Sequence, residues 1–136
     1  MILSLKKIAP ILNAKWHGIS ENTFIDNISI DSRSLQNGER TLFFALVGTN
    51  NDAHLYISSL INEGVQNFVV THIPDNLEKK ANYLVVENTL VAFQQFATYY
   101  RQLFNFRVIG ITGSNGKTIV KEWLNFLLSP DYNIIR

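Results

Sequence analysis

Apolar residues along the first 105 positions follow two kinds of spacing. They recur every three or four residues at Leu5, Ile8 and Leu12, which indicates a short helix with Ser4 as its cap. They form a nearly unbroken run over 41–47, which is typical of a strand buried in a parallel sheet. The same criteria predict, in chain order, a helix over 4–12, strands over 14–16, 24–31 and 41–47, a helix over 53–63, strands over 66–71 and 83–86, and a helix over 89–104. This alternation predicts an α/β fold.

The long helix predicted over 89–104 carries an aromatic stripe. Phe93, Phe96, Ala97 and Tyr100 lie on one face at helical spacing. A stripe of this kind is the usual signature of a helix face that packs on a sheet. We therefore interpret it as core packing rather than as a ligand-binding surface.

A second pattern begins at residue 106. Residues 106–111 are rich in apolar and β-branched residues, as in a buried parallel strand, and the apolar residues of 121–128 have helical spacing. Between them lies a loop of small, polar and basic residues: Gly113, Ser114, Asn115, Gly116, Lys117 and Thr118. We predict a strand, a loop and a helix, and a boundary that divides the chain into units 1–105 and 106–136.

The sequence of this loop is typical of a phosphate-binding loop. Glycines let backbone N–H groups turn toward phosphate oxygens, Lys117 supplies a cation, and Thr118 offers a hydroxyl to Mg²⁺. The full pattern would place a further glycine at Ile111, so only the shorter G-x-x-G-K-T is present. The alternative is a turn that links strand to helix, followed by a solvated lysine. The helix start favours bound phosphate, and hence ATP with Mg²⁺.

The loop begins close to the end of the 136 residues. An ATPase domain of this kind needs further strands and a carboxylate for the metal, and 132–136 would only begin the next strand. We therefore expect these residues to be part of a longer chain and to catalyse nothing by themselves.

Composition narrows the classes of protein. An apolar content of 46% and a net charge of +1, without a dense basic stripe, favour a globular domain with no nucleic-acid partner. The chain has no cysteine, no apolar run of membrane-spanning length and no signal-sequence pattern. We expect a cytoplasmic protein without membrane insertion.

Polar residues form a second group in the first unit. Asp31, Ser32 and Arg33 follow one predicted strand, and the Asp-Ala-His triplet at 52–54 follows the next. Each piece alone is typical of a turn, a surface charge or a helix start. Together, at the ends of strands, such groups suit a nucleotide sugar, because a guanidinium pairs well with a diphosphate.

The order of these motifs resembles the Mur ligases of peptidoglycan synthesis. D-S-R, F-F-A-L-V-G, D-A-H and V-I-G-I-T-G-S-N-G-K-T follow one another, and the resemblance covers most of the chain. It implies a Mur ligase N-terminal substrate-binding domain over 1–105, then the first strand, phosphate-binding loop and helix of an ATP-binding domain over 106–136. The residue pattern is most similar to that of the branch that joins D-alanyl-D-alanine to UDP-N-acetylmuramoyl-tripeptide. The segment K-T-I-V-K-E-W-L resembles the form of that ligase fused to an alanine racemase.

The resemblance also implies roles for individual residues. The residues that would meet the UDP part of the substrate are Ser32, Arg33, Thr49, Asn50 and Asn51. The loop from Gly113 to Thr118 would hold ATP, with Thr118 toward Mg²⁺, and Lys117 would act in catalysis by offsetting charge on the transferred phosphoryl group. Pyridoxal phosphate would be needed only if a racemase domain follows.

Two positions depart from the family pattern. Ala53 stands where the family commonly has glycine, so the local backbone there is expected to differ. Ile119 stands where the family often has serine or threonine, which removes one hydroxyl near the phosphates. Neither change touches Lys117 or Thr118.

The residues leave several alternatives open. Within the enzyme class, these are a Mur ligase that adds diaminopimelate or lysine, or a ligase of the folylpolyglutamate type. A general P-loop NTPase or small-molecule kinase would bind ATP without a preference for UDP-sugars. A non-catalytic nucleotide-binding or interaction module would fold around the first unit and use the C-terminal helix as a docking element. The sequence does not determine the third residue of the tripeptide or the oligomeric state.

Overall fold

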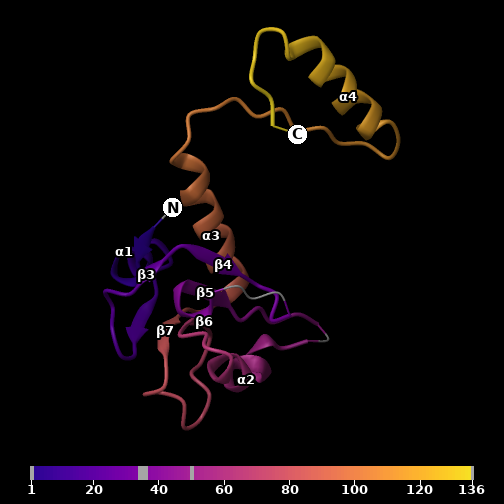
Figure 1. Ribbon diagram of the computed structural model, residues 1–136. Coiled ribbons are helices and arrows are strands. Elements are labelled where there is room, and N and C mark those ends of the chain that lie inside the picture. The colour runs from indigo at the N-terminus through magenta and orange to yellow at the C-terminus, as the bar shows by residue number, and fades with distance from the viewer. Residues whose placement is uncertain (1, 34–36, 50, 136) are drawn as a thin grey trace. The chain divides into compact units, whose positions relative to one another are not determined.

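The computed structural model describes residues 2–33, 37–49 and 51–135 and divides into two compact units (Figure 1). The first unit is Met1–Phe104 and the second is Asn105–Arg136. Among the described residues, no helix has both the length and the apolar content needed to cross a bilayer.

A five-stranded sheet forms the centre of the first unit. Its order is β2 (Lys15–His17), β7 (Asn82–Val85), β6 (Asn67–Val70), β5 (Thr41–Phe44) and β4 (Asn27–Ser29). Strands β4 to β7 run parallel to one another, and only the edge strand β2 is antiparallel to its neighbour. A separate antiparallel pair joins β1 (Leu3–Ser4) to β3 (Phe24–Ile25).

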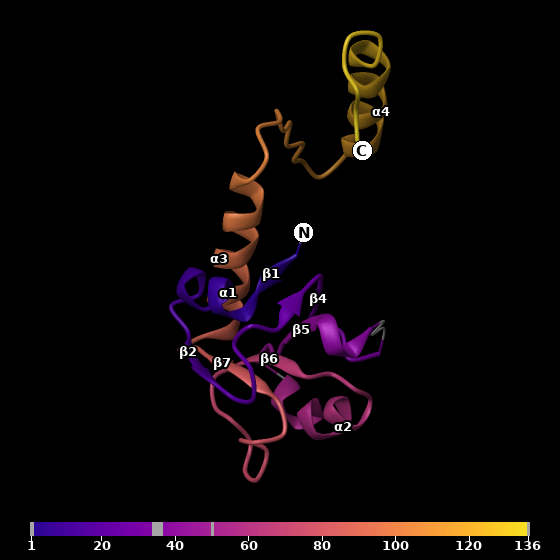
Figure 2. The same cartoon turned by 60° about the vertical axis from the view of Figure 1, so that its left-hand side comes forward.

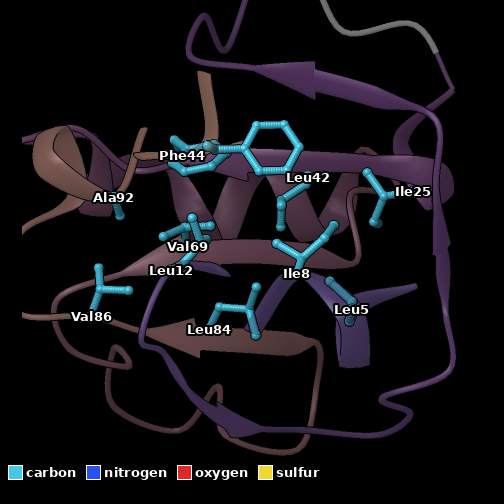
Figure 3. Close-up of a cluster of buried hydrophobic side chains, with 11 residues drawn as sticks. Leu5, Ile8, Leu12, Ile25, Leu42, Phe44, Val69, Leu84, Val86 and Ala92 are labelled. Atoms are coloured by element: carbon cyan, nitrogen blue, oxygen red, sulfur yellow. The ribbon is translucent and has the colours of Figure 1, made fainter. Parts of the chain in front are cut away.

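Helices cover both faces of this sheet. On one face, α1 (Leu5–Ile11) and α3 (Thr89–Gln102) share a core with Leu42 and Phe44 of β5. Figure 3 shows the labelled side chains of this cluster pointing toward one another. On the other face, the 3₁₀ turn η2 (Ala53–Tyr56) and α2 (Ile57–Asn62) share a core with Phe43 and Phe68 (Figure 2). Every residue of β5 and β6 is therefore buried, as parallel strands require.

Two buried asparagines tie the amino ends of the central strands together. Asn67 and Asn82 are directly paired in register, and the Asn82 Nδ2 group donates to Asn67 Oδ1 at 3.0 Å. The Asn82 Oδ1 atom accepts from the backbone N–H groups of Ile19 and Ser20, at 2.9 and 2.8 Å. The Asn67 Nδ2 group donates to the Glu39 carbonyl oxygen at 2.8 Å. One side-chain network thus joins two strands to two connecting segments.

The residues predicted as one strand over 24–31 form two strands instead. The break falls at Asp26, whose backbone N–H donates to the Arg40 carbonyl oxygen at 3.1 Å and whose carboxylate pairs with the Arg40 guanidinium at 3.1 Å. Because the chain turns there, β3 pairs with β1 while β4 pairs with β5. The alternating apolar pattern was right, but it could not show that the two halves join different sheets.

The first helix begins without the predicted serine cap. Ser4 occupies the cap position, but its side chain makes no capping hydrogen bond. The N–H groups of Leu5 and Lys6 donate instead to the carbonyl oxygens of Thr23 and Glu21, at 3.0 and 2.8 Å. The neighbouring chain segment thus satisfies the donors that a side-chain cap would otherwise satisfy.

The other predicted elements of the first unit are confirmed with shifted ends. The helix expected over 53–63 is η2 followed by α2, and Gly64, just after its C-cap residue Glu63, has a φ of +93°, the left-handed conformation common after a helix end. The aromatic stripe of α3 packs as predicted at Phe93 and Phe96, whose rings lie 5.1 and 6.2 Å from that of Phe44. Farther along the stripe, Tyr100 is 41% exposed.

The second unit contains one helix, α4 (Lys117–Leu128), within its described residues. Residues 106–111, predicted as a strand, and 132–135, predicted to begin another, lie in no strand. A parallel strand is held by hydrogen bonds to neighbouring strands, and the described part of this unit supplies no such neighbour. The apolar side chains of Trp123, Phe126 and Leu127 are exposed as a result.

Removal of the Asn82 amide should destabilise the first unit. Asn82→Ala leaves Asn67 Oδ1 without its buried donor and frees two backbone N–H groups, so we expect a loss of about 2 kcal/mol in the free energy of unfolding. Urea unfolding followed by circular dichroism measures this loss. The matched control is Asn62→Ala on an exposed position, which should change stability by ~0.5 kcal/mol or less. Equal effects of the two substitutions would contradict the role of the network.

Candidate functional site

The carboxyl ends of the parallel strands bring the predicted substrate residues to one edge of the sheet. Ser32 and Arg33 follow β4, and Thr49 and Asn51 follow the neighbouring strand β5. Asn50 lies outside the described residues. In open parallel sheets this edge is where ligands bind, because the backbone groups and loops there are not used by the core. The structure therefore gathers the two sequence motifs on adjacent strands.

Arg33 is held in place by a local ion pair. The Asp31 carboxylate accepts three hydrogen bonds from Arg33, from the backbone N–H, Nε and Nη2, each at 3.0 Å. Ser29 Oγ supports this turn by donating to the Asp31 carbonyl oxygen at 3.0 Å. The Arg33 side chain is 87% exposed, so a planar cation is presented to solvent in a defined direction.

This ion pair shifts the pKa values of both Asp31 and Arg33. The hydrogen bonds from the Arg33 side chain, and then that from its backbone N–H, lower the pKa of Asp31 from its ordinary value of 3.8 to about 2. The side-chain hydrogen bond to Asp31 also raises the pKa of the Arg33 guanidinium above its ordinary value. Both groups are accessible to water, so salt will weaken the pair.

The loop after β5 is a tight reversal. Val47 and Asp52 form an antiparallel bridge, and the Gly48 N–H donates to the Asn51 carbonyl oxygen at 2.8 Å. Tyr56, at the end of η2, donates its hydroxyl to Asn51 Oδ1 at 3.2 Å. Sequence reasoning missed this tyrosine, although its position five residues after Asn51 in a predicted helix was a usable signal.

His54 lies beneath this loop and is almost completely buried. Its side chain is 3% exposed, its Nδ1 atom lies 2.7 Å from Asp52 Oδ1, and its Nε2 atom accepts from the Thr71 backbone N–H at 3.0 Å. The His72 ring stacks on it, with 4.5 Å between centroids and 8° between planes. Sequence reasoning placed His54 in the Asp-Ala-His motif of the polar group but gave its ring no role of its own, and it missed Thr71 and His72. Their only signal was their place directly after a buried strand.

Asp52 is held in its ionised form at this point. Its carboxylate accepts from the His54 backbone N–H at 2.9 Å, and this hydrogen bond is the main reason why the pKa of Asp52 lies below its ordinary value. The His54 side chain adds to the same effect, while partial burial opposes it. The carboxylate is thus a fixed acceptor at the base of the loop.

The predicted phosphate-binding loop lies in the second unit, at the start of α4. Gly113 and Gly116 have φ values of +146° and +77°, which are left-handed conformations that side chains rarely adopt. Lys117 Nζ donates to the Gly113 carbonyl oxygen across this loop. The remaining members of the predicted set, Ser114, Asn115 and Thr118, are all exposed.

The donor set of this loop fits a triphosphate with a divalent cation. The N–H groups of the first helical turn and the positive end of the helix dipole face the loop, and Lys117 adds a cation. The hydroxyl of Thr118 stands in the first turn of α4, where a metal-bridged phosphate would lie. Among the described residues, no group of three histidine, aspartate or glutamate side chains is placed to hold a metal by itself.

Comparisons with known proteins agree on one family. No protein-family model matches the chain. The UDP-N-acetylmuramoyl-tripeptide–D-alanyl-D-alanine ligase of Synechocystis sp. is 39% identical over 116 residues, which are 85% of this chain and 25% of that protein. The corresponding ligase of Buchnera aphidicola subsp. Acyrthosiphon pisum is 37% identical over 133 residues, 98% of this chain and 28% of that protein. A crystal structure of MurF from Acinetobacter baumannii superposes with a TM-score of 0.81 at 30% identity, over 96% of this chain and 28% of that one.

Sequence and fold together define the class: the chain belongs to the Mur ligase family. Within that family it is similar to ligases named for the joining of D-alanyl-D-alanine to UDP-N-acetylmuramoyl-tripeptide. A ligase named for diaminopimelate, from Phocaeicola vulgatus, is also similar, at 32% identity over 114 residues. The chain spans about a quarter of the length of these relatives.

The Asp31–Arg33 pair gives a testable titration. Because the folded pKa of Asp31 is depressed, the pair contributes to stability above the ordinary value of 3.8, and this contribution is lost as the pH falls from there toward about 2. The Asp31 carboxyl ¹³C signal should therefore titrate near pH 2 in the unaltered chain and at a higher pH in Arg33→Ala, although still below 3.8 because the backbone N–H of residue 33 continues to donate to the carboxylate. Arg107→Ala is the control and should leave the Asp31 midpoint near 2. An unchanged midpoint in Arg33→Ala would show that the ion pair does not form in solution.

Proposed function

We propose that this chain carries the UDP-sugar-binding domain, over 1–105, and the start of the ATP-binding domain, over 106–136, of a peptidoglycan ligase. The reaction is the ATP-dependent joining of D-alanyl-D-alanine to UDP-N-acetylmuramoyl-tripeptide. One observation carries this proposal: the relative matched over 133 residues spans both the sheet-edge loops and the phosphate-binding loop. A general nucleotide-binding protein would need only the second of these.

The substrate's UDP group is assigned to the carboxyl edge of the sheet. Arg33 would bind the diphosphate, since a guanidinium offers parallel N–H groups to its oxygens and this one is already exposed and oriented. Ser32, Thr49 and Asn51, together with Asn50, would supply hydroxyl and amide hydrogen bonds to the ribose, base or sugar. The support is their shared place after β4 and β5.

The ATP is assigned to the loop from Gly113 to Thr118. An oxygen of the tripeptide carboxylate attacks the γ-phosphorus, ADP leaves, and an acyl phosphate results. The amine of D-alanyl-D-alanine then attacks the acyl carbon, and inorganic phosphate leaves as the amide forms. Lys117 offsets charge on the transferred phosphoryl group, and the helix N-terminus binds the phosphates. Mg²⁺, with Thr118 among its ligands, would neutralise further phosphate charge.

The cellular setting follows from these ligands. Because the reaction consumes ATP and a UDP-linked precursor, we place the protein in the cytoplasm, with small molecules as its partners and neither nucleic acid nor membrane insertion required. Pyridoxal phosphate belongs to the proposal only for a chain that continues into a racemase domain. The second candidate function is the addition of diaminopimelate within the same family, which the relative from Phocaeicola vulgatus supports.

Binding by the 136-residue chain tests the two assignments separately. UDP-N-acetylmuramoyl-tripeptide should shift the backbone amide signals of 30–33 and 47–54, and Mg-ATP those of 110–120. Arg33→Ala should weaken the first ligand about tenfold, the effect of losing one charge-assisted contact, and leave the second unchanged. Lys117→Ala should do the reverse, so each variant is the control for the other. If the UDP-sugar perturbs only residues after Gly113, the substrate assignment is wrong.

Turnover should be absent despite this binding. We expect the 136 residues to form no amide and release no ADP when mixed with both substrates and Mg-ATP, because the ligases they resemble are about four times as long. A coupled ADP-release assay and mass spectrometry of the product check this expectation. Detection of ATP-dependent amide formation would overturn it.

A further inference from the structure

The sheet edge contains one buried group that the proposed function does not use. His54 lies below the proposed substrate loop, and its ring joins segments 17 residues apart in sequence. On one side it meets Asp52, at the base of the reversal that carries Thr49 and Asn51. On the other side it meets the Thr71 N–H, directly beyond β6. The ring is therefore a hydrogen-bonded link between two loops of the candidate site.

The hydrogen bonds fix the form of the imidazole. A backbone N–H can only donate, so Nε2 must be the unprotonated nitrogen when it accepts from Thr71 at 3.0 Å. The proton then lies on Nδ1, where the Asp52 carboxylate accepts it at 2.7 Å. The charged and titratable side chains that face the ring are Asp52 and the stacked His72. The ring thus acts as a neutral donor on one side and an acceptor on the other.

We propose that His54 is a positioning residue for UDP-sugar binding: its neutral ring holds Asp52, and with it the Val47–Asp52 bridge, at a fixed place relative to the end of β6. The inference rests on the proposed function, since it concerns the loop assigned to the substrate. His54 itself is 5% exposed, so its role is one of support rather than of direct contact with a ligand. It acts through Asp52, whose carboxylate also accepts from the His54 backbone N–H, so the loop base is held by two hydrogen bonds from one residue.

Two substitutions of His54 each keep one of the two hydrogen bonds of the ring and remove the other. The amide of His54→Asn lies near the position of Nδ1 and can still donate to Asp52, but it cannot reach Thr71. The amide of His54→Gln lies near the position of Nε2 and can still accept from Thr71, but it is displaced from Asp52. Neither can make both contacts, so both should loosen the loop. His17→Gln, on the exposed edge strand β2, is the matched histidine control.

The first measurement needs no ligand. The chain has three histidines, so the imidazole ¹⁵N signals can be assigned by single substitutions. At neutral pH, His54 should show a protonated Nδ1 and an unprotonated Nε2. Hydrogen exchange at the Gly48 N–H, which is bonded to Asn51, should be at least about tenfold faster in His54→Asn and His54→Gln than in His17→Gln. A protonated Nε2, or unchanged Gly48 exchange, would overturn the proposal.

The second measurement is the affinity for UDP-N-acetylmuramoyl-tripeptide, at a temperature where thermal unfolding shows every variant to be folded. Both His54 variants should bind about tenfold more weakly, with the affinity for Mg-ATP unchanged, and His17→Gln should match the unaltered chain. Folded His54 variants with faster Gly48 exchange but normal affinity would overturn the positioning role. Absence of binding to the unaltered chain would instead contradict the proposed function, while the tautomer and exchange results would still decide whether His54 holds the loop.

Discussion

Burial of the parallel strands on both faces is the constraint on which the rest of the first unit depends. Every residue of β5 and β6 is buried, so their backbone groups can be satisfied only by neighbouring strands and their side chains only by helices on both sides. Polar side chains within the sheet must then find partners inside it, as Asn67 and Asn82 do. Polar groups that must be accessible to a ligand can therefore lie only at the strand ends. The carboxyl ends carry the ion pair, the reversed loop and the buried histidine, whereas the asparagine network closes the opposite ends.

This arrangement explains how much of the fold could be predicted from the sequence. Nearly continuous apolar runs such as 41–47 indicate buried strands, because a parallel strand covered on both faces carries apolar side chains on both. The division at Asp26 could not be found in this way, because it depends on a contact with Arg40, which is distant in sequence. The prediction of a strand over 106–111 was wrong for a related reason. Local pattern records the tendency to extend, but a strand exists only where another strand pairs with it.

The candidate site shows the same difference between residues that a sequence motif identifies and contacts between residues far apart in the sequence. Arg33, Thr49 and Asn51 were named from motifs, and their gathering on adjacent strand ends follows from parallel topology. Asp52 and His54 belong to one short motif at a helix start, so no role for the imidazole ring itself could be assigned from the sequence. Its second partner, the backbone N–H of Thr71, has no side-chain signature at all. A residue that holds a site through backbone contacts is therefore visible only when the fold is known.

The Asp31–Arg33 turn has a thermodynamic consequence for whatever anion reaches this edge. A free arginine side chain loses rotamer freedom when it binds, at a cost of about 0.5–1.5 kcal/mol. Here two hydrogen bonds to one carboxylate have already restricted the guanidinium before any ligand arrives. Part of the side-chain entropy that Arg33 would lose on binding an anion is thus already lost when the chain folds. The same carboxylate also remains beside the bound anion as a repulsive charge, so the turn favours ligands able to share the cation over those that must take it entirely.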